Sequence, residues 1–203
     1  MDCDDDIGFP ATDVTLVVED KKIHVNKAVL SQHSPVFNAM FSGSFKESST
    51  IVITLDNKKA KDFVAFLGCF YPNMNHTLTK NNVLQVLPLA HEYQSPLVAD
   101  CEEFMISMCK PETSLTVTIL LDYILVAEKY DLQKFLDTAA KFCADVDFDL
   151  LNGKKFEKDN ALEWGMIPVG YTSKQTETVD KNIALKYLRI DPKTRLLIAE
   201  NRL

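Results

Sequence analysis

The residues that could carry out chemistry are scattered along this 203-residue sequence, and no familiar spacing joins them. The four histidines never form an H-x-x-x-H pair, and no two cysteines form the C-x-x-C pair typical of zinc and redox sites. The run 152–155 (NGKK) lacks the first glycine of a phosphate-binding loop and the hydroxyl that follows its lysine. No G-x-S-x-G nucleophile motif occurs. The sequence therefore predicts no enzyme, metal or cofactor, and only a site assembled from distant residues would reverse this.

The acidic and thiol groups have simpler interpretations. Glu102 and Glu103 are neighbours on a predicted helix, a spacing more typical of a solvated face than of a catalytic pair. The five cysteines are odd in number and mostly lie among apolar residues, as reduced thiols do. The first ten residues, MDCDDDIGFP, lack the basic and apolar regions of a secretory signal. No apolar run approaches the roughly 20 residues that span a bilayer. These features favour the cytoplasm or the nucleus and no membrane partner.

Charge is distributed unevenly between the two ends of the chain. The net charge is −7, with 12 basic against 22 acidic residues (−10) in 1–149 and 10 against 7 (+3) in 150–203. An acidic body argues against binding to a phosphate backbone, so we expect no nucleic-acid partner. The basic C-terminal part is more typical of a solvated helical face.

The pattern of apolar residues predicts an α+β fold. Two β-branched runs, 14–18 and 23–25, favour a hairpin, and 51–55 favours a third strand. Between them, one helix follows Val25, and a second begins where Ser34 can cap it and Pro35 occupies its first turn. From residue 58 onward the pattern is almost wholly helical, with one helix stopped by Pro72 and the next starting near Thr79. This order predicts a small sheet covered by helices.

A weak internal repeat occurs in the helical part. Ala-His-Glu-Tyr at 90–93 and Ala-Glu-Lys-Tyr at 127–130 are 37 residues apart, and a predicted helix follows each. Two such hairpins could stack as helical repeats do. The alternative is that any two amphipathic hairpins look alike. Two further helices are predicted, from Thr178 to Ile190 and from Asp191 to Leu203.

The strand, the two helices and their residues resemble the BTB (POZ) family. Its pattern of Asp-Val-x-Leu, Lys-Ala-x-Leu and Ser-x-x-Phe-x-x-Met-Phe stands between Asp13 and Phe41. The residues at 24–28 and 70–73 are most similar to those of nematode BTB proteins, which often carry a MATH domain. The leader before Asp13 leaves no room for a MATH domain. The resemblance implies a BTB fold with a C-terminal helical extension. The expected segments are an acidic leader (1–12), the BTB domain (13–110), a hairpin similar to the start of a BACK domain (111–149), and a loop with helices (150–203).

The resemblance also implies a cullin-binding site. Cullin-binding BTB domains carry a hydrophobic-x-Glu motif after the Met-Phe helix, and Phe45-Lys46-Glu47 matches it. A Phe buried on binding could contribute roughly 1.5–3 kcal/mol, and a charge-assisted hydrogen bond of the Glu about as much. The alternative is that Phe45 folds back onto the core and Glu47 faces water. The expected cullin-binding residues are Phe41, Phe45, Glu47 and Tyr93.

Finally, the resemblance implies a homodimer formed through the first helix and an exchanged N-terminal strand. Asp13 and Lys27 match the family's charged pair, for which a strand-end salt bridge is an equal alternative. The expected dimer interface comprises Asp13, Val14, Leu16, Lys27, Val29, Leu30, His33 and Phe37. The leading hypothesis is a protein-protein interaction module: a cullin-RING ubiquitin-ligase adaptor for an unknown substrate. The alternative is an oligomerisation scaffold that binds no cullin, in a transcriptional or cytoskeletal assembly.

Overall fold

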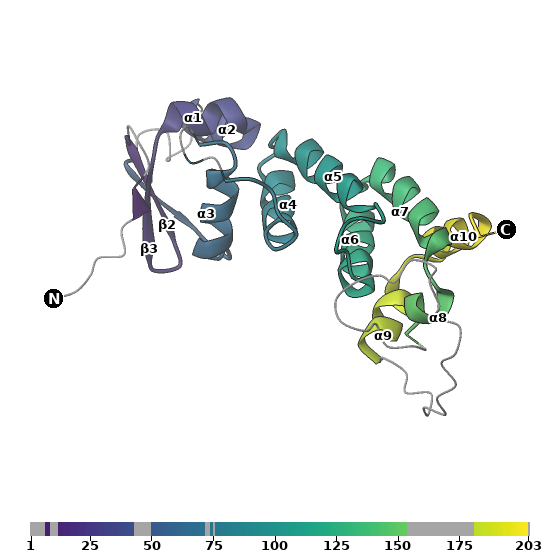
Figure 1. The fold of residues 1–203 in the computed structure, drawn as a ribbon. Helices are drawn as coiled ribbons and strands as arrows, with labels where there is room; N and C mark the ends of the chain where they lie inside the picture. The colour runs from purple at the N-terminus through teal and green to yellow at the C-terminus, as the bar shows by residue number, and fades with distance from the viewer. Residues whose placement is uncertain are drawn as a thin grey trace. The chain divides into compact units, whose positions relative to one another are not determined.

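The computed structural model describes residues 7–8, 12–42, 50–71, 74, 76–153 and 181–202 (Figure 1). The chain divides into two compact units, residues 1–101 and 102–203. The first unit is a mixed sheet with helices, and the second is helical in its described part. No described helix has the length and apolar character that crossing a membrane requires.

A four-stranded sheet, in the order β1-β3-β2-β4, forms the base of the first unit. Strands β2 (Val14–Val18) and β3 (Lys21–Val25) form the predicted antiparallel hairpin, and β4 (Val52–Leu55) is the predicted third strand, parallel to β2. The sequence pattern did not predict β1 (Ile7–Gly8), which pairs in parallel with β3. Two residues are too few to show an alternating pattern, so only the pairing partner reveals this strand.

Alternation along the strands gives the sheet one apolar face. Val14, Leu16 and Val18 are at most 2% exposed, whereas the residues between them are half-buried. Helices α1 (Lys27–His33), α2 (Pro35–Ser42) and α3 (Ala60–Gly68) lie on one side of the sheet (Figure 1). The α+β architecture predicted from the sequence is therefore confirmed.

Two helix boundaries differ from the prediction. Helix α3 ends at Gly68 rather than near Pro72, and the ring of His76 lies so close to Gly68 that a Cβ atom there would be 2.1 Å from its Nδ1. Helix α4 (Val83–Glu92) begins four residues after Thr79. The Asn82 side chain accepts a hydrogen bond from the Thr79 N–H at 2.7 Å and donates one to the Thr77 carbonyl at 3.1 Å. These bonds hold the segment in a turn, because they compete with helical ones.

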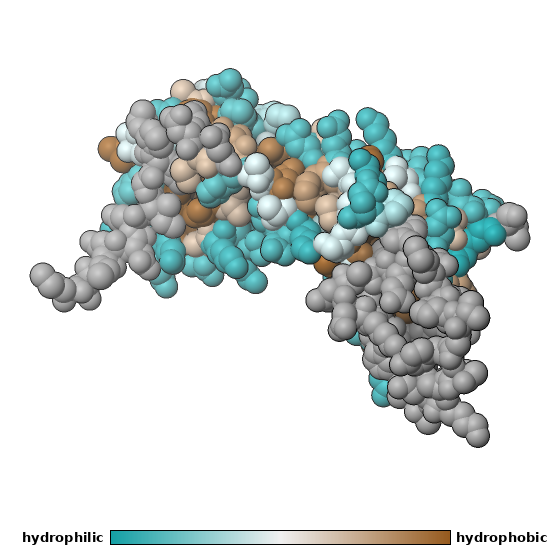
Figure 2. Space-filling view, viewed as in Figure 1, coloured by the Kyte–Doolittle hydropathy of each residue, from teal (hydrophilic) through white to brown (hydrophobic). Residues whose placement is uncertain are grey.

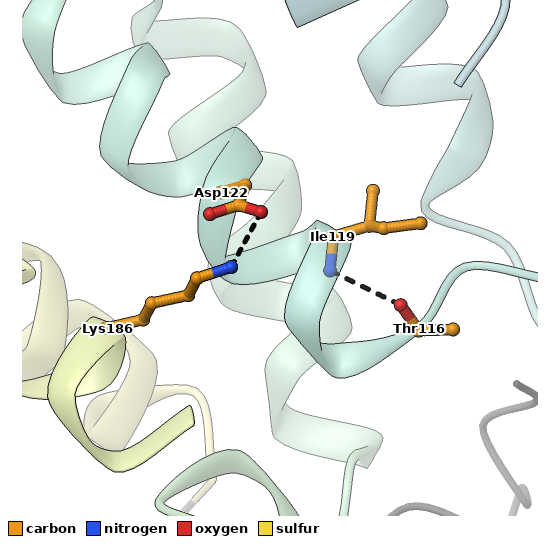
Figure 3. Close-up of polar contacts among 4 residues, drawn as sticks. All are labelled: Thr116, Ile119, Asp122 and Lys186. Carbon is orange, nitrogen blue, oxygen red and sulfur yellow. Dashed lines mark hydrogen bonds and ion pairs between the residues drawn. The ribbon is translucent and has the colours of Figure 1, made fainter. Parts of the chain in front are cut away.

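Helix α5 (Leu97–Met108) contains the boundary between the two units, and the second unit continues with two longer helices. Helices α6 (Val117–Lys129) and α7 (Gln133–Asp145) pack as a hairpin, followed by the short α8 (Phe148–Leu151). Helix α9 (Lys181–Arg189) packs on α6, and α10 (Pro192–Glu200) packs on α7. An ion pair of 2.7 Å between Lys186 and Asp122 joins α9 to α6 (Figure 3). The guanidinium of Arg202 donates to the carbonyls of Cys143 and Val146, at the end of α7.

The internal repeat corresponds to two turns with the same backbone hydrogen bonds. After α4, the N–H of Tyr93 donates to the Leu89 carbonyl and that of Ser95 to the Ala90 carbonyl. The second turn repeats these bonds 37 positions later, from 130 to 126 and from 132 to 127. The residue after each tyrosine has a left-handed backbone conformation, with φ of 50° at Gln94 and 55° at Asp131. This is the Schellman arrangement that ends many helices, so the repeat is a structural one.

Candidate functional site

Two of the predicted cullin-binding residues, Phe41 and Tyr93, lie in α2 and just after α4, where a cluster of aromatic rings joins these elements. Phe37 is fully buried and stacks on Tyr93 at 4.4 Å between ring centroids. Phe63 of α3 meets both rings edge to face, at 6.4 Å and 5.7 Å. Phe66 stacks on Tyr93 at 5.8 Å. Because such pairs contribute about 0.5–1.5 kcal/mol each beyond the buried area, this aromatic cluster holds α2 firmly against α3 and the end of α4.

Ser34 links the start of α2 to the same cluster. Its Oγ accepts from the Phe37 N–H at 3.1 Å, so the predicted N-cap is confirmed. The same hydroxyl donates to the backbone carbonyl of Tyr93 at 2.6 Å. Ser34 is fully buried, and these two bonds satisfy its hydroxyl as donor and acceptor.

Tyr93 is mainly a core residue in this chain. Only 4% of its surface is exposed, and burial, followed by the charge of Glu92, raises the pKa of its phenol. Its predicted place in a docking groove therefore rests on a small part of the side chain. Its larger contribution is to fix the position of α2.

Phe41 is the predicted cullin-binding residue that the structure places at the accessible end of α2. It is half-buried, stacks on Phe37 at 5.8 Å, and has the Lys27 ammonium 5.5 Å from its ring centroid. The other two predicted residues, Phe45 and Glu47, lie outside the described residues.

The pair Asp13 and Lys27 has a specific structural role. The Asp13 carboxylate accepts from the backbone N–H of Lys27 at 2.7 Å, at the first residue of α1. The Asn26 side chain accepts from the Val29 N–H at 3.1 Å, so both acceptors satisfy N–H groups that the first helical turn leaves unpaired. The charged pair thus includes a helix cap, a role that the sequence pattern alone did not reveal.

The eight predicted dimer-interface residues fall into two groups. Val14, Leu16, Leu30 and Phe37 are at most 2% exposed and belong to the core of this chain. Within this chain the sheet and its helices surround these side chains, and their part in a dimer stays a prediction. Asp13 is exposed, and the remaining three are half-buried: Lys27, Val29 and His33. The His33 ring also stacks on Phe70 at 4.7 Å.

The described residues offer little nucleophilic or metal-binding chemistry. The four described cysteines are free thiols, and burial raises the pKa of Cys101, Cys109 and Cys143 to about 12. Near neutral pH these three therefore carry almost no thiolate, which is the reactive form. No group of three or more potential metal ligands occurs in the described ranges.

Two long-range hydrogen bonds of the first unit could not be predicted from neighbouring residues in the sequence. The buried Tyr71 hydroxyl accepts from the backbone N–H of Asn26, and the Glu19 carboxylate accepts from the Ala60 N–H at 2.9 Å, at the start of α3. Each joins residues more than 40 positions apart. Glu19 has a left-handed backbone conformation, with φ of 55°.

Comparison with known proteins assigns the first unit. A family model described as "BTB/POZ domain" matches residues 10–109. The chain is 33% identical over 135 residues to BTB and MATH domain-containing protein 38 of Caenorhabditis elegans, covering 66% of this chain and 33% of that protein. It is 29% identical over 190 residues to Kelch-like protein 21 of Danio rerio, covering 91% of this chain and 29% of that protein. The chain thus spans about a third of the length of these relatives.

Proposed function

This chain is a BTB/POZ domain protein, belonging to a family of protein-protein interaction domains, and on that premise we propose that it is a self-associating adaptor that docks a cullin scaffold. The match of Phe45-Lys46-Glu47 to the hydrophobic-x-Glu motif carries the proposal. Phe41, accessible at the end of α2, would border the same surface. The sequence does not identify the target of such an adaptor.

The rigidity of α2 supports a docking role for its C-terminal end. The aromatic cluster holds α2 through Phe37, and the two hydrogen bonds of Ser34 hold its N-terminus. A partner that binds a surface held in place loses less conformational entropy than one that must order it. Family membership supports self-association as well, with the accessible residues Asp13, Lys27, Val29 and His33 as the surface.

The adaptor proposal is tested with the double variant Phe45→Ala/Glu47→Ala of the full chain. Binding to a cullin N-terminal domain is measured by isothermal titration calorimetry. Losing one buried aromatic ring and one charge-assisted hydrogen bond should weaken binding by about a hundredfold or more, since 1.4 kcal/mol corresponds to tenfold. A matched control removes an exposed apolar side chain and an exposed acid from the second unit, Leu185→Ala/Glu103→Ala. The control should bind as the unmodified chain does.

Light scattering separates this function from the alternative. A dimer that gains the mass of the cullin domain supports the adaptor, whereas a dimer that never binds cullin supports the oligomerisation scaffold. Equal cullin affinity of the double variant and the unmodified chain would contradict the role of Phe45 and Glu47.

A further inference from the structure

Helices α9 and α10 of the second unit carry unusually exposed apolar side chains. Leu185, Leu188 and Leu196 are 62%, 63% and 59% exposed. The described surface of this unit is otherwise largely hydrophilic on the face that Figure 2 shows. Isolated exposed leucines need no explanation, but those that border a concave surface indicate a binding site.

Leu188 borders such a surface. A shallow groove of about 700 Å³, largely open to solvent, lies between the C-terminal end of α6 and the turn that joins α9 to α10. Its apolar lining comes from Leu125, Leu188, Ile190 and Pro192. This volume is sufficient for one or two large side chains of a partner.

The groove is also lined by three cations and two acids, so its lining carries a net charge of +1. Lys129, Arg189 and Arg195 contribute the positive charges. The two acids of the lining each accept a hydrogen bond from a backbone group: Glu128 from the Asp191 N–H at 3.0 Å, and Asp191 from the Lys193 N–H at 2.8 Å.

Two other cations of the unit have partners within it. Lys186 pairs with Asp122 (Figure 3), and Arg202 donates to two backbone carbonyls. In contrast, the Nε–H of Arg195 is buried and has no acceptor among the described residues. A buried donor without an acceptor is unfavourable, so a carboxylate that drew this guanidinium toward the groove would recover part of that cost.

We propose that this groove docks an acidic peptide segment of a partner protein. One large apolar side chain of the segment lies between Leu125 and Leu188, and a neighbouring Asp or Glu pairs with Arg189 and Arg195. The apolar lining suits a peptide better than a nucleic acid, because apolar side chains offer neither charge nor hydrogen bonds to phosphates. This site is separate from the cullin surface and does not depend on cullin binding.

The test begins with a phage-displayed library of random short peptides selected on the full chain. Selected peptides are synthesised with a fluorescent label, and their affinity is measured by fluorescence anisotropy. We expect enrichment of Asp or Glu beside Leu, Ile, Met or Phe. Arg189→Glu should weaken binding by about tenfold or more, the effect of one lost charge-assisted contact. Lys181→Glu is the matched control, since it makes the same charge change on the same helix outside the groove lining.

Four outcomes would overturn the proposal. These are the absence of enrichment, the enrichment of basic peptides, and an equal loss of affinity in Arg189→Glu and Lys181→Glu. The fourth is an oligomer of the unmodified chain, seen by light scattering, that Arg189→Glu dissociates, because the groove would then bind a second copy. Circular dichroism confirms that both exposed-site variants are folded.

Discussion

The turns at Tyr93 and Tyr130 have the same backbone and different surroundings. Both end a helix with the same pair of hydrogen bonds, and a left-handed residue follows each tyrosine. Tyr93 is 4% exposed inside the aromatic cluster, and its carbonyl accepts from Ser34. Tyr130 is half-buried, and the ammonium of its neighbour Lys129 lies 5.0 Å from the ring centroid.

The comparison shows how one turn can have two uses. The backbone bonds are local, so they recur wherever a helix ends in this way. The contacts of each tyrosine side chain depend on the unit in which it lies. In the first unit that is a closed aromatic core, and in the second it is a partly solvated surface. The candidate cullin surface therefore depends on a residue whose sequence context has a near copy elsewhere in the chain.

The largest expected difference between the turns comes from removing each ring. Tyr93→Ala should lower the free energy of unfolding by about 3–5 kcal/mol, because it leaves a cavity among Phe37, Phe63 and Phe66. Tyr130→Ala should cost about 1 kcal/mol or less, because its ring is partly solvated and leaves a smaller cavity. Chemical denaturation measures the total, and hydrogen exchange should place the loss from Tyr93→Ala in α2 and α3. Similar losses for the two variants would mean that the two tyrosines contribute equally to stability.

A smaller difference is expected between two helix caps. Ser34→Ala removes the cap of α2 and the bond to the Tyr93 carbonyl, so it should cost about 2 kcal/mol. Thr116→Ala removes only the cap of α6, where Oγ1 accepts from the Ile119 N–H at 3.3 Å (Figure 3), and should cost about 1 kcal/mol. Denaturation midpoints of the two variants test the ranking. A larger loss for Thr116→Ala would mean that the Ser34 bond to Tyr93 adds nothing.

The smallest difference concerns the left-handed residue that follows each tyrosine. Gln94→Gly should stabilise the chain by about 0.5 kcal/mol, since relief of the backbone strain exceeds the added entropy of the unfolded state. Asp131→Gly should change stability by nearly zero, because Asp tolerates this conformation better than Gln. Thermal denaturation can compare the two variants. Destabilisation by Gln94→Gly would show that the Gln side chain makes a contribution that outweighs the strain.

Local sequence patterns were sufficient for most of the fold. Runs rich in β-branched residues predicted β2, β3 and β4, and Ser34 followed by Pro35 predicted the start of α2. The repeated tyrosines predicted two similar turns. These patterns failed where a side chain acts on a nearby turn, as Asn82 does before α4 and His76 does beside Gly68, and where a strand is very short. The late start of α4, the early end of α3 and the presence of β1 are examples.

By itself the sequence determined the elements of this protein and its membership of the BTB/POZ family. Both depend on periodicity and short motifs, which are properties of neighbouring residues. Only the tertiary structure decided which predicted site residues are accessible. Leu16, Leu30 and Phe37 proved to be core, Tyr93 became part of an aromatic cluster, and Asp13 caps a helix. These outcomes depend on contacts such as Ser34 with Tyr93, 59 residues apart, and burial by distant segments leaves no mark in the local sequence.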